Sequence, residues 1–123
     1  MKKFLTIVLA VFLGGTAFAQ EAPAKAKVES AEKFAADKRN GKFEFQLPET
    51  ATAENVKKTA AYYTQYFTVN FDQKTKKAKL TMLQTDEKSK HVIVRFLVSN
   101  DVKEVTMDGK DYKTEEFFQQ YIR

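Results

Sequence analysis

The chain has 123 residues, a formal net charge of +5 and no cysteine. This length is that of one small domain. The lack of cysteine excludes disulfides, thiolate nucleophiles and thiolate metal sites. Without Lys2 and Lys3, which we expect to be removed with an N-terminal signal, the net charge is +3 (19 lysines and arginines against 16 acidic residues), an ordinary solubility charge. It does not indicate a nucleic-acid partner, which would require lysine and arginine side chains gathered on one face.

Residues 1–19 have the order of a secretory signal peptide. Two lysines precede an apolar run over 4–13, and 17–19 reads Ala-Phe-Ala, a cleavage pattern. The apolar run is too short to span a bilayer. We therefore expect cleavage before Gln20, a periplasmic or secreted protein, and no stable membrane anchor after cleavage. A signal that is retained as an anchor is the alternative.

The segment 20–41 is rich in Ala, Lys and Glu and contains Pro23. We expect it to be a flexible leader, because order is weakest near chain ends. The alternative is a short amphipathic helix over 28–38, indicated by apolar residues at helical spacing: Val28, Ala31, Phe34 and Ala35. Asn40 and Gly41 predict a turn before a single domain over 42–123.

Residues 42–47 alternate between polar and apolar side chains, which predicts a half-buried strand that ends at Pro48. Thr52 is the expected N-cap of a helix. Four apolar residues at helical spacing define its buried face: Val56, Ala60, Tyr63 and Phe67. Alternation then returns and predicts a hairpin of two strands, 69–72 and 78–82, with a lysine-rich connection.

A second helix is predicted over 87–99, since its apolar residues share one face and its start is acidic. The β-branched residues over 91–98 make a strand the alternative there. A strand over 103–107 follows, then a turn, and Thr114 is the expected cap of a terminal helix.

This order predicts an α+β, ferredoxin-like βαββαβ sandwich with a four-stranded antiparallel sheet, two helices on one face and a C-terminal helix. The expected inward residues of the sheet are Phe43, Phe45, Leu47, Val69, Phe71, Leu80, Met82, Val105 and Met107. The opposite face is expected to be polar, with Glu44, Gln46, Asn70, Lys79, Thr81, Glu104 and Thr106.

The stretch 68–80, TVNFDQKTKKAKL, resembles the middle hairpin of heavy-metal-associated domains of the copper-chaperone type. The order of elements over 43–107 is similar to theirs, so the resemblance implies a ferredoxin-like fold. In that family two cysteines in the first strand–helix loop bind the metal. The corresponding loop over 48–52 has none, so no metal site and no cofactor is expected here.

His91 is the only histidine. Asp86, Glu87 and Glu49 are its candidate acidic neighbours, too loose a set to define a metal site. Ser89, two residues away on the same helix, does not face it. The sequence therefore contains no assignable catalytic residue. We expect His91 to be a surface side chain.

Two aromatic sets are candidates for a partner surface. Tyr62 and Tyr66 form an i, i+4 pair at the margin of the first helix, and packing beneath the terminal helix is their alternative role. Phe117, Phe118 and Tyr121 belong to an apolar stripe on the terminal helix, which either docks on the domain or binds a partner.

The function expected from these features is a non-catalytic interaction module, exported and bound to another envelope protein. A homodimer is compatible with this interpretation. The alternative is a small-ligand or metal-ion sensor or carrier with a ferredoxin-like fold.

Overall fold

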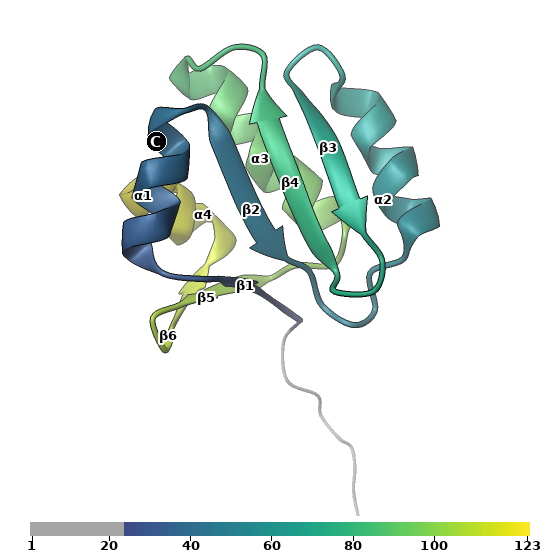
Figure 1. Ribbon diagram of the computed structural model, residues 1–123, viewed down its shortest axis with the longest axis horizontal. Helices are drawn as coiled ribbons and strands as arrows, with labels where there is room; N and C mark the ends of the chain where they lie inside the picture. Colours follow the sequence, from purple (N-terminus) through teal and green to yellow (C-terminus); the bar gives the residue numbers. More distant parts are fainter. Residues whose placement is uncertain (1–23) are drawn as a thin grey trace, which may run out of the picture.

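The computed structural model describes residues 24–123, so the predicted signal peptide over 1–19 lies outside the described residues. One mixed sheet of six strands forms the centre of the molecule, in the order β3-β4-β2-β1-β5-β6. Its buried face is covered by helices (Figure 1). None of the helices among residues 24–123 is both long and apolar enough to cross a membrane.

The chain over 24–41 is part of the fold rather than a flexible leader. Strand β1 (Lys25–Val28) buries Ala26 and Val28, whereas its two lysines point outward. Helix α1 (Ala31–Arg39) begins at Ser30, whose side chain accepts a hydrogen bond of 3.1 Å from the Lys33 amide. The structure therefore differs from the expected mobile leader over 24–41, and the alternative, a short helix over 28–38, corresponds in part to α1. Strand β1 has a parallel partner far along the chain in β5.

Strand β2 (Lys42–Gln46) and helix α2 (Ala53–Ala60) follow the predicted order, and Thr52 caps α2 through a 3.1 Å bond from the Asn55 amide. The helix is shorter than its apolar spacing indicates. A 3-10 turn, η1 (Ala61–Tyr63), ends it, and Phe67 starts the next strand.

Strands β3 (Phe67–Asp72) and β4 (Lys77–Met82) form the predicted hairpin. Helix α3 (Glu87–Ser99) confirms the helical interpretation of that segment over the alternative of a strand. Its N-cap Asp86 accepts a 3.1 Å bond from the Ser89 amide, and six side chains on it are buried.

Strand β5 (Glu104–Met107) is followed by a strand that the sequence analysis missed, β6 (Lys110–Lys113). The two are joined by Asp108 and Gly109, both with positive φ, 53° and 78°. Such a pair closes a two-residue hairpin whose twist matches the strands. The terminal helix is α4 (Thr114–Phe117), which continues as the π-helical turn η2 (Phe118–Ile122). The expectation that Thr114 caps this helix is wrong, because Thr114 is its first residue and Lys113 is the N-cap.

The α+β class is confirmed, but the predicted four-stranded antiparallel sheet is wrong. The sheet has six strands and is mixed, since β1 is parallel to β5 and antiparallel to β2. β1 lies between β2 and β5 and thereby separates two strands that a ferredoxin-like sheet would place side by side. β1 and β6 are the two strands beyond the four that were predicted.

Helix α1 lies along β2 where a neighbouring strand would otherwise continue. β1 pairs with β2 only at Lys27, opposite Gln46, and the chain then turns into α1 (Figure 1). Phe34 of α1 reaches the buried face, with its ring centroid 5.5 Å from that of Phe43 and 5.7 Å from that of Phe45.

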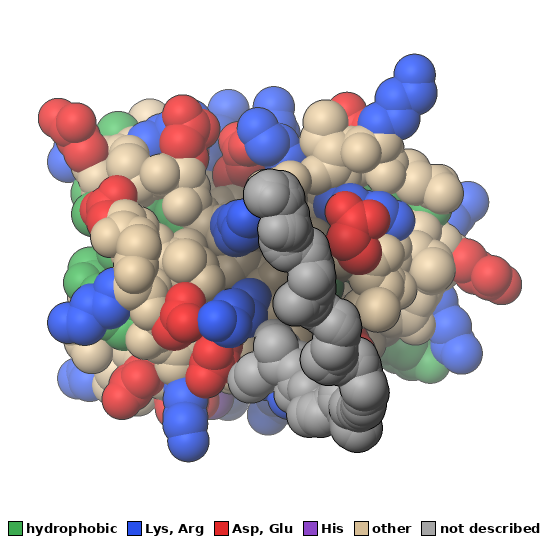
Figure 2. Space-filling view, turned by 90° about the horizontal axis from the view of Figure 1, so that it is seen from below, with side chains coloured by type: hydrophobic (Ala, Val, Ile, Leu, Met, Phe, Trp, Pro, Cys, Tyr) green, Lys and Arg blue, Asp and Glu red, His purple; other side chains and the backbone are tan. Residues whose placement is uncertain are grey.

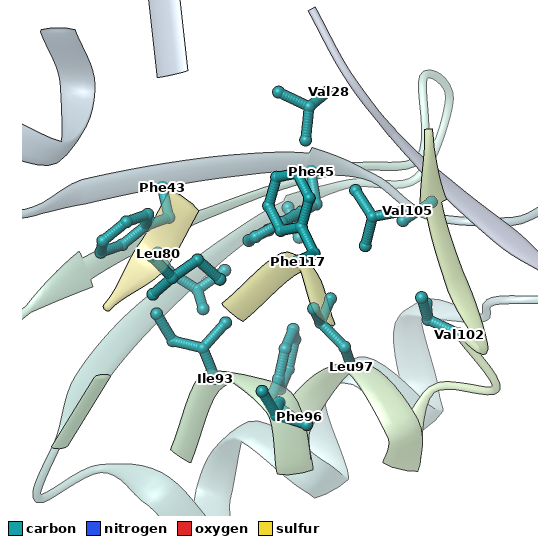
Figure 3. Close-up of a cluster of buried hydrophobic side chains, with 14 of the residues drawn as sticks. Val28, Phe43, Phe45, Leu80, Ile93, Phe96, Leu97, Val102, Val105 and Phe117 are labelled. Atoms are coloured by element: carbon teal, nitrogen blue, oxygen red, sulfur yellow. The ribbon is translucent and has the colours of Figure 1, made fainter. Parts of the chain in front are cut away.

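The core lies between the sheet and the helices. Side chains from β2 and β4 meet those of α3 (Figure 3). The ring centroid of Phe117 in α4 lies 5.2 Å from that of Phe34. The core contains residues from nearly every element, and its largest fully buried side chains are Phe43, Phe45, Phe67, Phe96, Phe117, Phe118, Leu80, Ile93, Leu97, Ile122, Val56 and Val102. Of the predicted inward residues, only Val69 and Phe71 remain partly exposed.

Replacing Phe34 with Ala tests whether α1 belongs to the folded domain. We expect F34A to lower the free energy of unfolding by about 3–5 kcal/mol, because it removes a side chain that is 97% buried among aromatic rings. Chemical denaturation monitored by circular dichroism measures this. The control is Glu32→Ala, an exposed position on the same helix, and an equally small effect of both variants would contradict the packing of α1.

Candidate functional site

Strand β3 lies at one end of the sheet, and among the described residues β4 is its only strand partner. The Leu83 amide donates a 2.9 Å bond to the Tyr66 carbonyl. Since residues of an antiparallel pair bond alternately, Thr68 and Asn70 also bond to β4. The amides and carbonyls of Phe67, Val69 and Phe71 therefore point outward at the free edge.

An apolar groove of about 450 Å³ runs between α2 and this edge. Val69 and Phe71 are half-buried in it, because α2 presents mostly small side chains and ends at Ala60. Lys57 is the single charged residue of the lining. The lining consists of Ala53, Val56, Lys57, Ala60, Ala61, Thr64, Phe67, Thr68, Val69 and Phe71.

The two edges of the sheet differ in their charge. The sequence of β3 is FTVNFD, with one charged residue at its end and no proline. At the opposite edge β6 is KDYK, and its Asp111 forms a 2.7 Å ion pair with Lys25. Charged side chains protect an edge from pairing with another strand, so β6 is protected and β3 is open.

Tyr62 and Tyr66 of the predicted partner surface lie next to this open edge. Tyr62 is 70% exposed, and Tyr66, which directly precedes β3, is half-buried. They are not packed beneath the terminal helix, since α4 lies at the other side of the molecule (Figure 1). Leu83, 58% exposed, is bonded to Tyr66 through its amide and adds to the same surface.

The second predicted set is not at the surface. Phe117 and Phe118 are fully buried in the core, and Tyr121 is half-buried with its hydroxyl 3.1 Å from that of Tyr112. The stripe on the terminal helix thus docks on its own domain. Phe117 and Phe118 are therefore not accessible to a partner in this conformation.

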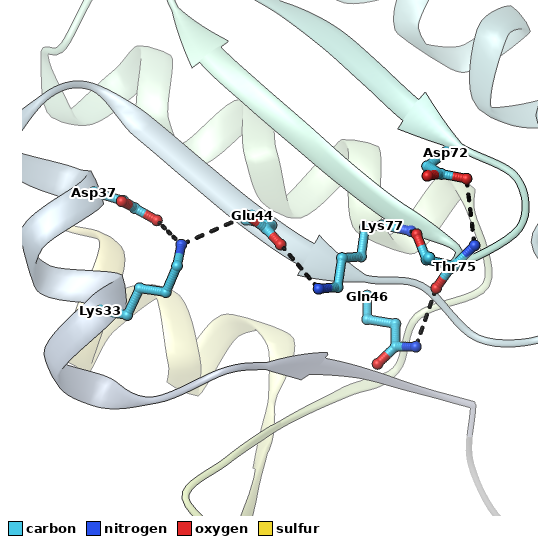
Figure 4. A network of polar contacts seen from close by, with 7 residues as sticks. All are labelled: Lys33, Asp37, Glu44, Gln46, Asp72, Thr75 and Lys77. Atoms are coloured by element: carbon cyan, nitrogen blue, oxygen red, sulfur yellow. Dashed lines mark hydrogen bonds and ion pairs between the residues drawn. The ribbon is translucent and has the colours of Figure 1, made fainter.

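A polar groove of about 300 Å³ lies beside α1 on the other face of β2. Lys33 Nζ is 2.7 Å from Asp37 Oδ2 and 3.6 Å from Glu44 Oε1 (Figure 4). Lys77 Nζ is 3.7 Å from the second carboxylate oxygen of Glu44. The hydrogen bond to Asp37 raises the pKa of Lys33.

This polar groove carries both signs of charge above an apolar base. Val28 and Phe34 form the base, while Lys27 and Glu29 extend the charged wall. Gln46 closes one end through a 3.0 Å bond from its side-chain amide to the Thr75 carbonyl. Such a lining suits a small polar ligand with both positive and negative groups, although its charges already pair with one another.

His91 is paired with Glu115 rather than with the acidic residues that the sequence suggested for it, although Glu87 lines the same pocket. Its Nε2 lies 2.9 Å from Glu115 Oε1, and its ring packs 4.5 Å from that of Phe118. Asp86 instead caps α3, and Glu87 faces Arg123 at 3.4 Å. Over residues 24–123, no three His, Asp or Glu side chains are grouped closely enough to hold a metal ion.

No protein-family model, curated protein or solved structure matches the chain.

Removing His91 tests its pairing with Glu115. The hydrogen bond from His91 lowers the pKa of the Glu115 carboxyl, so we expect His91→Ala to raise that pKa toward its ordinary value. Because the pKa of Glu115 is lowered in the folded wild type, its pairing with His91 contributes its full stabilisation of the folded state at pH values above the carboxyl's unfolded pKa. It is lost as the pH falls through the lowered value.

A titration of the Glu115 carboxyl carbon by NMR measures this shift. Lys103→Ala, an exposed position remote in sequence from both residues, is the control and should leave the midpoint where it is. An unchanged midpoint in His91→Ala would show that the pair does not form in solution.

Proposed function

We propose that the chain is an exported, periplasmic or secreted interaction module without catalytic activity, which binds a partner at the free edge of β3. The observation that carries the proposal is the combination of outward amides and carbonyls on Phe67, Val69 and Phe71 with the apolar groove beside them. An added strand would pair with these groups and cover the two half-buried side chains, the mode known as β-strand addition.

The charges of the visible surface favour a protein partner over nucleic acid. Lysines and acidic residues are interspersed on the face seen in Figure 2, outside the part covered by grey atoms. Nucleic acid would require a patch of one sign. Tyr62 and Tyr66 suit a protein partner, since each combines an apolar ring with a hydroxyl group.

We propose the absence of a catalytic role because the candidate catalytic side chains, His91 and Ser89, already make other contacts. His91 is paired with Glu115 and packed on Phe118. The Ser89 hydroxyl donates a 2.7 Å bond to Asp86, which caps the helix. A nucleophile and a base that face each other, as acyl transfer requires, are not assembled from these groups.

We further propose that β2–α2–β3–β4–α3–β5 is a ferredoxin-like unit in which β1 has been inserted. Without β1 and β6, the strand order reads β3-β4-β2-β5. The resemblance to heavy-metal-associated domains is proposed for this unit alone. It does not extend to metal transfer, because the chain has no cysteine.

The second candidate function is a sensor or carrier of a small polar ligand, and the polar groove beside α1 is the observation that favours it. This candidate predicts that a bound ligand at 100 times its dissociation constant stabilises the protein by about 2.7 kcal/mol. Thermal unfolding across a panel of amino acids and other zwitterions measures this. Lys77→Gln, which removes one cation of the groove, should abolish the gain. A flat panel would exclude this role for the groove.

Photo-crosslinking at the edge of the sheet tests the main proposal. We expect a benzoylphenylalanine placed at Thr68, exposed on β3, to form a covalent adduct with a protein in the producing cell, because the partner lies against that strand. The same group at Lys110 on the charged edge β6 is the control and should form none. Adducts are detected by electrophoresis and mass spectrometry, and a silent Thr68 position would overturn the proposal.

A further inference from the structure

We propose that the partner at the free edge is a second copy of this chain, with two β3 strands paired antiparallel about a two-fold axis at Val69. This inference rests on the proposed function and names its partner. It would join the two sheets into one continuous sheet.

The sequence of β3 is self-complementary in that register. Phe67-Thr68-Val69-Asn70-Phe71 is nearly symmetric about its centre. Phe67 then meets the partner's Phe71, and Thr68 meets the partner's Asn70. An antiparallel pair gains most when apolar side chains oppose apolar ones and polar oppose polar.

The hydrogen-bond pattern permits the same register. The outward groups belong to Phe67, Val69 and Phe71, as the Tyr66–Leu83 bond establishes. A two-fold axis at Val69 opposes Val69 to the partner's Val69, and Phe67 to the partner's Phe71. Every outward amide and carbonyl of the three residues then faces a complementary group.

Other symmetric registers are poorer. A centre at Phe71 would place Val69 opposite the partner's Gln73, and a centre at Phe67 would place it opposite the partner's Gln65. In each shifted register, an apolar side chain on the groove side is exposed or faces a polar side chain of the partner. The register centred on Val69 is the one that keeps the apolar side chains together.

Charge and space also agree with a second copy. The one charged residue of β3, Asp72, would face the partner's Tyr66, so no like charges oppose each other along the strand. On the groove side, α2 contributes the small side chains Ala53 and Ala60 to the lining. Lys57 is exposed and long enough to keep its ammonium group in water.

A charge-swap experiment tests both the dimer and its register. In T68E/N70E, each new acid would face an acid on the partner strand. In T68K/N70E, each new lysine would face an acid. Both positions are exposed, so neither pair alters the core. The full chain, purified as the producing cell processes it, is examined by sedimentation equilibrium, and circular dichroism confirms that each variant is folded.

We expect wild type to be a dimer. T68E/N70E should raise the dissociation constant of the dimer at least about tenfold, because like charges then oppose each other. T68K/N70E should return that constant to the wild-type value. Lys88→Gln/Lys103→Gln has the same net charge change as T68E/N70E, at exposed positions outside β3, and should leave the dimer intact.

Three outcomes would overturn the inference: a monomeric wild type, a dimer that T68E/N70E leaves unchanged, or a folded T68K/N70E that stays dissociated. A monomer that nevertheless crosslinks through Thr68 to another protein would refute the second copy and leave the proposed function standing.

Discussion

The packing of Phe34 against three aromatic rings joins the first and last helices of the described chain to β2, a central strand of the sheet. Phe34 comes from α1, its neighbours Phe43 and Phe45 from β2, and Phe117 from α4, with centroid distances of 5.2 to 5.7 Å. Aromatic pairs in such tilted and edge-to-face arrangements contribute about 0.5–1.5 kcal/mol each beyond their burial. Because the chain has no cysteine, no disulfide shares this role. The N-terminal elements are held by packing and by the pairing of β1 with its neighbours.

This contact has consequences on both faces of the sheet. It holds α1 along the stretch of β2 that β1 leaves unpaired, so the helix replaces a strand there. Lys33, one residue before Phe34, then reaches over the open face to Glu44. The polar groove is therefore a by-product of how α1 covers β2, which explains why its charges pair with one another. Within residues 24–123, by contrast, no strand pairs with the outward amides and carbonyls of β3.

The parts of the fold that depend on local patterns were predictable from the sequence. The cap Thr52 and the hairpin of β3 and β4 rest on neighbouring residues. The short strand β1 was not predictable, since four residues carry little alternation and its parallel partner β5 lies far along the chain. β6 was predictable from the sequence, because an Asp-Gly pair followed by Lys-Asp-Tyr-Lys is typical of a two-residue hairpin.

The free edge of β3 and the groove beside it were not predicted from the sequence, although some of their residues were placed correctly. Alternation correctly placed Val69 and Phe71 on the helix side of the sheet, and the i, i+4 spacing singled out Tyr62 and Tyr66. The apolar spacing predicts a helix that continues to Phe67, and such a helix leaves no groove. In the structure α2 ends at Ala60 and leaves the strand edge uncovered. How far a helix covers a neighbouring strand is set by tertiary packing, which periodicity does not contain.

The contrast between the two sheet edges is a physical reason to regard β3 as a binding surface. A free edge with apolar side chains invites pairing with any exposed strand, and proteins suppress this with charge. β6 has three charged residues among its four, whereas β3 has one in six. Covering Val69 and Phe71 would gain about 25 cal/mol for each Å² of apolar surface removed from water. A partner strand that supplies both this cover and the missing hydrogen bonds satisfies the edge without changing the rest of the fold.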